Sequence, residues 1–349
     1  MSIPPEVLKF NEWPIWRRWV GLPDFSARQR ILAWGKLDGL LPGPWQKPLS
    51  MDPWLPRAGI FGESVLRLDL LAHCGSWDRN STVASISSGQ LKCSELSSSL
   101  VKTRILPNFQ CDILDVDGIA ASKSAELPFK DVDEFGCYFA EEQGASVDTR
   151  GLEMMLRHPE IRVIHAPGID QFHVSMWDGR LFLSNAGGSH HFAGAAYIAR
   201  RLGAVVPLAA DVVVSYLNVP LWNQLLDSYE IVQVPTWISR QAMSCVSKIL
   251  GECLMLTVPE RFGDGPLLFI PRNGSASGVI KSRLAAHGCL PLSQFISDLI
   301  RAQEECERSM LRNKPTLAQA LKELGAGEIT CGLLPQDAVG NFLPSQTMP

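Results

Sequence analysis

The stretch that most constrains this chain is LFLSNAGGSHHFAGAAYIARRLG at residues 181–203, where an apolar run, a glycine turn and an alanine-rich segment follow one another. The residues before it alternate apolar and polar types around Asp178-Gly179, a pair typical of tight turns, and predict a β-hairpin over 172–184. The alanine-rich segment predicts a helix over 190–202. One face of that helix is apolar and mostly small, as close packing on a sheet requires: Phe192, Ala195, Ala196, Ala199 and Leu202. A hairpin that leads into such a helix predicts an α/β (mixed α+β) fold.

The same alternation of patterns extends on both sides of this stretch. Upstream, the sequence predicts a lead-in or strand over 127–135, a helix over 146–158 and a strand over 161–166. Downstream, it predicts strands and helices in turn: strands over 205–214 and 229–238, a helix over 239–252, a strand, loop and helix over 267–288, and helices over 292–313 and 316–325.

The first part of the chain has a different composition. Residues 1–60 contain nine prolines and six of the ten tryptophans, which favours an irregular arm. Trp13, Trp16 and Trp19 recur every three residues and form either a docking or membrane-surface segment or, as we favour, anchors that hold the arm on the main body. The predicted division is therefore a Trp/Pro-rich arm (1–60), a core domain (61–215) whose residues 61–125 are strands and turns, a C-terminal α/β region (216–334) and a flexible tail (335–349).

Bulk composition narrows the class of protein. The chain has 349 residues, 46% hydrophobic and 19% charged, as globular proteins do. Its net charge of −4 does not favour nucleic acid, so DNA or RNA binding would need a local basic patch. The nine cysteines contain no CxxC pair, which argues against a zinc site or a disulfide framework. Without a signal-peptide pattern or an apolar run of about 18 residues, we expect a cytoplasmic protein with no membrane span.

The glycine turn before the predicted helix is the candidate binding site. A helix start offers unpaired amides and a partial positive charge, and glycines let a ligand approach the backbone. Ser189 is suited to cap the helix and Gly203 to end it. An anion, above all a phosphate, is the expected ligand, and its expected contacts are Asn185, Gly187, Gly188, Ser189, His190 and His191. The open alternatives are a plain serine cap and a half-buried His191 that belongs to the core.

Metal binding by the two adjacent histidines is less favoured, because neighbouring helix positions point about 100° apart. Imidazoles become cationic below a pH of about 6.5, which would add charge for an anion.

The arrangement around this turn resembles the ParB/sulfiredoxin superfamily. Sulfiredoxins carry Gly-Gly-Cys-His-Arg, an aromatic residue and Ala-Ala-Tyr, and this chain carries Gly187-Gly188-Ser189-His190-His191, Phe192 and Ala195-Ala196-Tyr197. Leu202-Gly203 and Val206-Pro207 match the downstream pattern, and the resemblance covers residues 126–215.

The resemblance implies a nucleotide, ATP, ADP or CTP, held with Mg²⁺ at this turn. Serine in place of the sulfiredoxin cysteine implies that sulfinic-acid reduction is not the reaction. Histidine in place of the usual arginine implies a weaker or pH-dependent hold on phosphate.

Further polar residues are candidates for the chemistry. Asp178, Asp211 and His173 lie near the turn in sequence, and Asp211 is the expected catalytic carboxylate and Mg²⁺ ligand. An acidic stretch upstream is a solvated face or a source of a base: Asp131, Asp133, Glu134, Glu141 and Glu142. A second strand–loop–helix offers a secondary anion site at Arg272, Ser275 and Lys281, although its spacing fails the Walker pattern and a plain connection is favoured.

The leading functional hypothesis is therefore phosphoryl transfer, or hydrolysis of a phosphodiester or nucleotide. In it His190 or His191 stabilises developing negative charge or donates a proton to the leaving group. One alternative is a non-catalytic interaction module in which a nucleotide regulates a protein partner through the Trp-rich arm or the helix at 290–313. Another is a protein that processes DNA or RNA, or takes part in partition.

Overall fold

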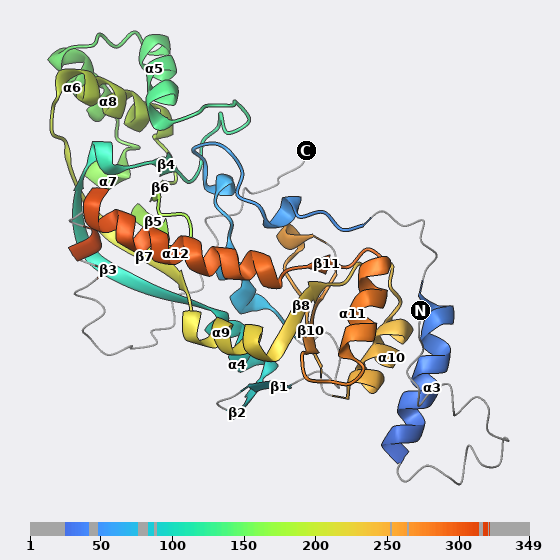
Figure 1. Ribbon diagram of the computed structural model, residues 1–349. Coiled ribbons are helices and arrows are strands. Elements are labelled where there is room, and N and C mark those ends of the chain that lie inside the picture. The colour runs from blue at the N-terminus through green and yellow to red at the C-terminus, as the bar shows by residue number, and fades with distance from the viewer. Residues whose placement is uncertain are drawn as a thin grey trace. The chain divides into compact units, whose positions relative to one another are not determined.

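The computed structural model describes residues 25–41, 48–75, 83–86, 89–251, 253–263, 265–313, 317–319 and 321, and Figure 1 labels their main elements. The chain divides into two compact units, each made of separate segments. One unit takes residues 1–54, 70–101 and 218–298, and the other takes residues 55–69, 102–217 and 299–349. Helices and strands are mixed in both units, so the predicted α+β class is confirmed.

The unit that contains residues 102–217 is built on a five-stranded sheet. Its strands run in the order β3 (Val101–Asp112), β7 (Pro207–Leu217), β5 (Gln171–Ser175), β6 (Leu181–Ser184) and β4 (Gly118–Ile119). β5 and β6 form the predicted antiparallel hairpin, and β5 pairs with β7 in parallel. Parallel neighbours need a crossover connection, and helix α8 (Ser189–Leu202) lies in this one. The turn before α8 therefore leaves the sheet at the end of β6.

Helices α5 (Val132–Glu142) and α6 (Thr149–Leu156) pack against α8, as Figure 1 shows. Side-chain caps begin both helices: Asp131 accepts the Glu134 amide at 2.8 Å, and Asp148 accepts the Gly151 amide at 2.8 Å. With a neighbour on more than one side, α8 buries more than the predicted stripe. Its buried residues are Ser189, Phe192, Ala193, Gly194, Ala195, Ala196, Ile198 and Ala199.

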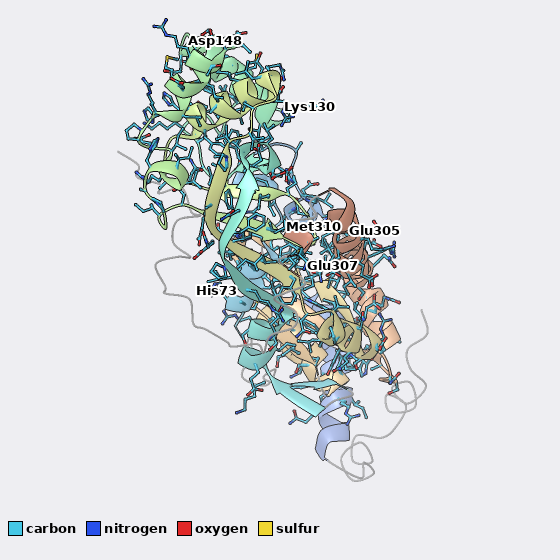
Figure 2. All side chains as sticks on the ribbon, turned by 90° about the vertical axis from the view of Figure 1, so that its left-hand side faces the viewer. His73, Lys130, Asp148, Glu305, Glu307 and Met310 are labelled. Carbon is cyan, nitrogen blue, oxygen red and sulfur yellow. The ribbon has the colours of Figure 1, made fainter. Side chains whose placement is uncertain are left out.

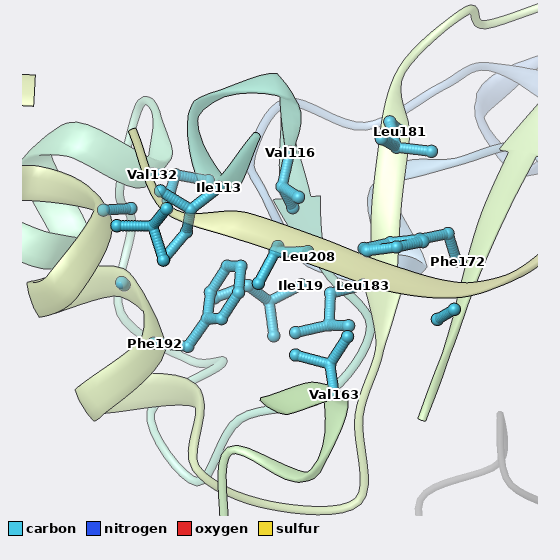
Figure 3. Close-up of a cluster of buried hydrophobic side chains, with 14 of the residues drawn as sticks. Ile113, Val116, Ile119, Val132, Val163, Phe172, Leu181, Leu183, Phe192 and Leu208 are labelled. Carbon is cyan, nitrogen blue, oxygen red and sulfur yellow. The ribbon is translucent and has the colours of Figure 1, made fainter. Parts of the chain in front are cut away.

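Phe192 of α8 packs in the core of this unit. Its side chain is 1% exposed, and Figure 3 shows it among residues of the sheet and of the chain around it: Ile119, Leu183, Leu208 and Val163. Leu202, which was predicted to share this face, is instead 40% exposed.

Helix α12 (Ser293–Asn313) adds to the same core through Met310, whereas Glu305 and Glu307 of that helix are exposed (Figure 2). Its Gln303 is buried and accepts the Leu217 amide at 2.7 Å, so it satisfies the end of β7.

The other unit is built on a four-stranded antiparallel sheet in the order β11 (Leu290–Pro291), β8 (Tyr229–Gln233), β10 (Leu267–Pro271) and β9 (Leu254–Leu256). Its helices are α3 (Phe25–Leu40), α4 (Cys93–Leu100), α9 (Val219–Ser228), α10 (Arg240–Leu250) and α11 (Ser277–Ala286). It also holds the hairpin of β1 (Val83–Ile86) and β2 (Gly89–Lys92). Among the described residues, none of the helices combines the length and the apolar character that crossing a membrane requires.

The predictions for four segments are wrong. The arm at 1–60 was expected to be irregular, but α3 occupies 25–40, because no proline falls between Pro23 and Pro42. The run at 161–166 was expected to be a strand and instead forms the single turn α7 (Arg162–His165), where the Asp170 carboxylate accepts the Val163 amide at 3.2 Å. Short apolar runs do not distinguish strand from buried turn by pattern alone.

The other two errors lie within residues 61–135. The segment at 64–73 was assigned to strands and turns, but short 3-10 helices occupy Gly62–Ser64 and Leu68–His73. The segment at 127–135 was assigned to a lead-in or strand, but α5 already begins at Val132. The predictions of the helices now seen as α6, α8, α10, α11 and α12 are confirmed, as is that of strand β7.

A glycine at the α5–α8 contact gives a test of this packing. A Cβ at Gly136 would lie 2.2 Å from the Ala193 carbonyl oxygen, whereas a Cβ at Gly194 would meet only the flexible end of Met155. Gly136→Ala is therefore expected to lower the free energy of unfolding by about 1–3 kcal/mol. Gly194→Ala, its matched control, should change stability by less, because Met155 can move. Urea denaturation of both variants measures the difference, and equal losses would contradict the close helix contact.

A buried histidine on β5 predicts a loss of stability in acid. His173 is 9% exposed, and burial lowers its pKa to about 4, although Asp69 opposes the shift. Between about pH 6.5 and 4 the unfolded chain binds the proton and the folded chain does not, so stability falls as the pH is lowered through this window.

The His173 contribution should reach about 2 kcal/mol near pH 5. Denaturation of the protein and of His173→Gln near pH 7.5 and near pH 5 checks this, since the variant should lose less stability on acidification. Equal losses in the two proteins would show that His173 is not the titrating group.

Candidate functional site

The glycine turn between β6 and α8 has a backbone that only glycine fits. Gly188 has φ 70° and ψ 11°, in the left-handed region, and it occupies the helix N-cap position. A Cβ on Gly188 would lie 2.6 Å from the carbonyl carbon and oxygen of Glu160. Ser189 is thus the first helical residue and not the predicted cap, because the chain passes too close to Glu160 for a side chain at the cap position. The prediction that Gly203 ends the helix is confirmed, since its amide donates to the carbonyls of Ala199 and Arg200.

Asn185 fixes the start of the turn. Its side chain is 7% exposed; its Nδ2 donates to the Gly187 carbonyl at 2.8 Å, and its Oδ1 accepts the Ala121 amide at 3.4 Å. The side chain of Asn185 therefore ties the turn both to itself and to the segment at Ala121.

A cavity of about 620 Å³ opens over this turn, and all six predicted contact residues line it. The amides of Ser189, His190 and His191 precede the first intrahelical bond, which runs from the Phe192 amide to the Gly188 carbonyl at 2.9 Å. Within the described part of the chain these three amides have no acceptor, as is usual in a first helical turn. The structure thus brings the predicted residues together around a cavity with free backbone donors.

His190 lies in a cluster of hydroxyl groups. Its Nε2 is 3.1 Å from the Ser124 Oγ and 3.4 Å from the Ser122 Oγ. Its ring stacks on Phe139 with centroids 3.6 Å apart and planes 5° apart. Burial lowers the His190 pKa, with Glu142 opposing and Lys123 reinforcing the shift. The imidazole is therefore mostly neutral near pH 7.

His191 stacks on another imidazole. The ring centroids of His158 and His191 are 3.7 Å apart at an angle of 15°. Burial first, and then the nearby His158 and His190, lower the pKa of His191, while Glu160 opposes them. The positive charge expected on His190 and His191 below pH 6.5 therefore develops only at lower pH.

Two carboxylates that sequence reasoning missed also line the cavity. The exposed Glu160 accepts the Gly188 amide at 3.3 Å through its Oε2. Asp170 is 3% exposed, accepts the amides of Val163 and Ala186 at 3.2 and 3.3 Å, and has its pKa raised by burial. The hairpin register could have revealed Asp170, because Gln171 pairs with Ser184 and so sets Asp170 opposite Asn185. No comparable sequence pattern predicts that Glu160, in the turn after α6, lies at the cavity.

The other sequence candidates lie elsewhere. Asp211 is exposed on β7, accepts the Asn108 amide at 2.9 Å and does not line the cavity. Asp178 pairs with Arg180 at 2.7 Å within the hairpin, and His173 is buried in β5. The structure therefore does not bring Asp211 to the turn as the expected base and Mg²⁺ ligand. The described segments also contain no group of three or more histidine, cysteine, aspartate or glutamate residues able to hold a metal ion.

The acidic stretch on α5 has structural partners. Besides the Asp131 cap, Asp133 forms ion pairs with Arg201 at 2.8 Å and Arg200 at 3.4 Å. These ion pairs link α5 to the end of α8. They agree with the interpretation of the acidic stretch as a solvated face of the helix.

At the predicted secondary anion site, a carboxylate of the chain itself pairs with the two basic residues. Arg272 and Lys281 approach each other around the Glu230 carboxylate, at 3.1 and 2.9 Å. Ser275 lies in the loop between β10 and α11. Glu230 thus stands where an anionic ligand was expected, which favours the plain connection. Trp13, Trp16 and Trp19 and the tail at 335–349 lie outside the described residues.

Comparison with known proteins identifies a family for this chain. No curated protein and no solved structure matches the chain. One family model matches residues 106–308, more than half of the chain, and this range includes every residue that lines the cavity. The chain therefore belongs to the family described as "Family of unknown function (DUF6685)".

Proposed function

We propose that the cavity binds the phosphate end of a nucleotide or a phosphorylated small molecule and that the protein transfers or hydrolyses this phosphoryl group. The observation that carries the proposal is the set of three free amides, of Ser189, His190 and His191, at a helix start that opens into the cavity. Converging amides and the positive end of a helix are a common way to hold phosphate. The resemblance of residues 126–215 to the ParB/sulfiredoxin superfamily supports the same ligand class.

Side chains around these amides suit a phosphate. Ser122, Lys123 and Ser189 line the same cavity and supply two hydroxyls and an ammonium group. Because His190 and His191 are neutral near pH 7, binding there would depend on dipoles and Lys123 more than on imidazolium charge.

Glu160 is the internal competitor for this ligand. Its carboxylate accepts the Gly188 amide at 3.3 Å and lies against Gly187, where a Cβ would approach the Oε2 at 3.2 Å. An anionic ligand would displace this exposed side chain and take over its amide bond. The carboxylate thus marks the place where we expect a phosphate oxygen.

The proposed ligands are ATP, ADP or CTP with Mg²⁺. The residues near the turn do not form a protein cage for the metal, because Asp211 lies elsewhere and the described residues hold no cluster of metal-binding side chains. Mg²⁺ would therefore enter on the nucleotide phosphates, as it does in many nucleotide sites.

Removing the competing charge should strengthen binding. In calorimetric titrations with ATP, ADP, CTP and inorganic phosphate, each with Mg²⁺, Glu160→Gln should lower the Kd of one or more ligands by roughly two- to fivefold, the value of an exposed charge contact. Glu153→Gln is the matched control, since Glu153 is an exposed glutamate on α6 that pairs with Arg157. It should leave every Kd unchanged.

The double variant Ser189→Ala/His190→Ala should lose binding in the same titrations. If it responds like the unchanged protein to every ligand, the phosphate site is not at this turn. Measuring product release with the same nucleotides separates the two remaining hypotheses, because binding without turnover favours a nucleotide-regulated interaction module.

A further inference from the structure

The hydroxyl of Ser122 has neighbours that determine where its hydrogen points. Its Oγ accepts the Ser189 hydroxyl at 3.1 Å and the Ser124 amide at 3.2 Å. A serine hydroxyl has two lone pairs and one hydrogen, so these two bonds use its acceptor capacity. With the ring proton of His190 on Nδ1, the hydrogen is left for the third neighbour, the Nε2 of His190 at 3.4 Å. A hydroxyl whose hydrogen faces a neutral imidazole is the arrangement of an activated nucleophile.

The imidazole of His190 is held in place to accept that hydrogen. Phe139 stacks on its face, and Phe135 meets it edge-on with centroids 5.7 Å apart. Glu142 and Lys123 are the charged groups that act on it in opposite directions, and His191 is the titratable neighbour on α8. A fixed, neutral ring satisfies the two requirements of a general base, which are reach and protonation state.

We propose that Ser122 is the nucleophile and His190 the general base of a phosphoryl transfer in this cavity. The inference rests on the proposed function, because it takes the bound phosphate ester as the substrate. Ser122 is favoured over its neighbours by position: it lines the cavity, whereas Ser124 does not, and the Ser189 hydroxyl is already donated to Ser122.

The reaction balances with water as the only co-reactant. The Ser122 Oγ forms a bond to phosphorus while the bond from phosphorus to the leaving oxygen breaks. The serine proton passes to the His190 Nε2 and then to that oxygen. Water next attacks the phosphorus of the phosphoserine, and His190 takes a proton from the water. The bond from phosphorus to the Ser122 Oγ breaks, His190 returns the proton to that oxygen, and inorganic phosphate leaves. The Ser189 hydroxyl and the Ser124 amide stabilise the negative charge that develops on the Ser122 oxygen.

A fluorophosphonate probe tests the nucleophile directly. Attack of the Ser122 Oγ on phosphorus expels fluoride, and the lasting adduct is located by peptide mass spectrometry. We expect the adduct on Ser122, no adduct in Ser122→Ala, and labelling slowed roughly a hundredfold in His190→Gln. Ser124→Ala should still be labelled, because the change removes only a competing partner of the His190 Nε2 at 3.1 Å.

The pH profile supplies a readout that a structural role would not give. Labelling should slow as the pH falls through the pKa of His190, which lies below the ordinary value of 6.5, and His190→Gln should lose this dependence. Circular dichroism confirms that each variant is folded. An adduct on Ser124 or Ser189, or an unchanged rate in His190→Gln, overturns the assignment.

Titration of the same preparations with ATP, ADP, CTP and inorganic phosphate, each with Mg²⁺, separates the two proposals. Binding without labelling refutes the nucleophile and leaves the phosphate site standing. Labelling of Ser122 without binding refutes the phosphate ligand, and with it phosphoryl transfer as the reaction of Ser122.

Discussion

The close approach of the Gly188 backbone to Glu160 is the constraint on which this site depends. With a Cβ distance of 2.6 Å and a left-handed backbone, no other residue fits the start of α8. The contact sets the first turn of α8 beside the segment that carries His158 and Glu160. Because the glycine has no side chain, the Glu160 carboxylate reaches the Gly188 amide, and the residues of the first helical turn line the cavity. The backbone geometry of Gly188 and the hydrogen bonds of the Asn185 side chain together shape the turn.

Small residues also allow close backbone contacts further along α8. Gly136 of α5 and Ala193 of α8 allow the two helices to touch, and this contact brings Phe139 over the ring of His190. The ring is then held against Ser122 and Ser124 by packing, with no need for a charged partner. The alanines and glycines of α8 thus serve two purposes, since they make the helix contact close and they orient the imidazole at the cavity.

The sequence predicted the elements with strong local signals and missed what depends on tertiary contacts. The hairpin around Asp178-Gly179 and the helix before Gly203 follow from local turn and cap chemistry. The turn α7 was mistaken for a strand because a short apolar run fits either structure, and the carboxylate of Asp170, seven residues after Val163, satisfies the backbone of the turn. The six predicted contact residues of the turn could be found from the sequence because they are neighbours in the chain. The sequence did not reveal Ser122, Glu160 or Asp170, which reach the cavity from other segments.

The charges around the cavity argue for a ligand that is held by orientation more than by net attraction. Burial keeps the imidazoles of His190 and His191 neutral near pH 7, and the cavity lining includes Glu160 and Asp170 beside a single lysine, Lys123. A free anion gains little from such a balance, because Glu160 already satisfies one amide. The proposed phosphate ester would gain more, since its oxygens would accept several amides at once and its remaining atoms would lie in a cavity of about 620 Å³. Amide donors on a rigid helix start also need no reorganisation as charge moves from a nucleophile to a leaving group, which is the property that stabilises a transition state.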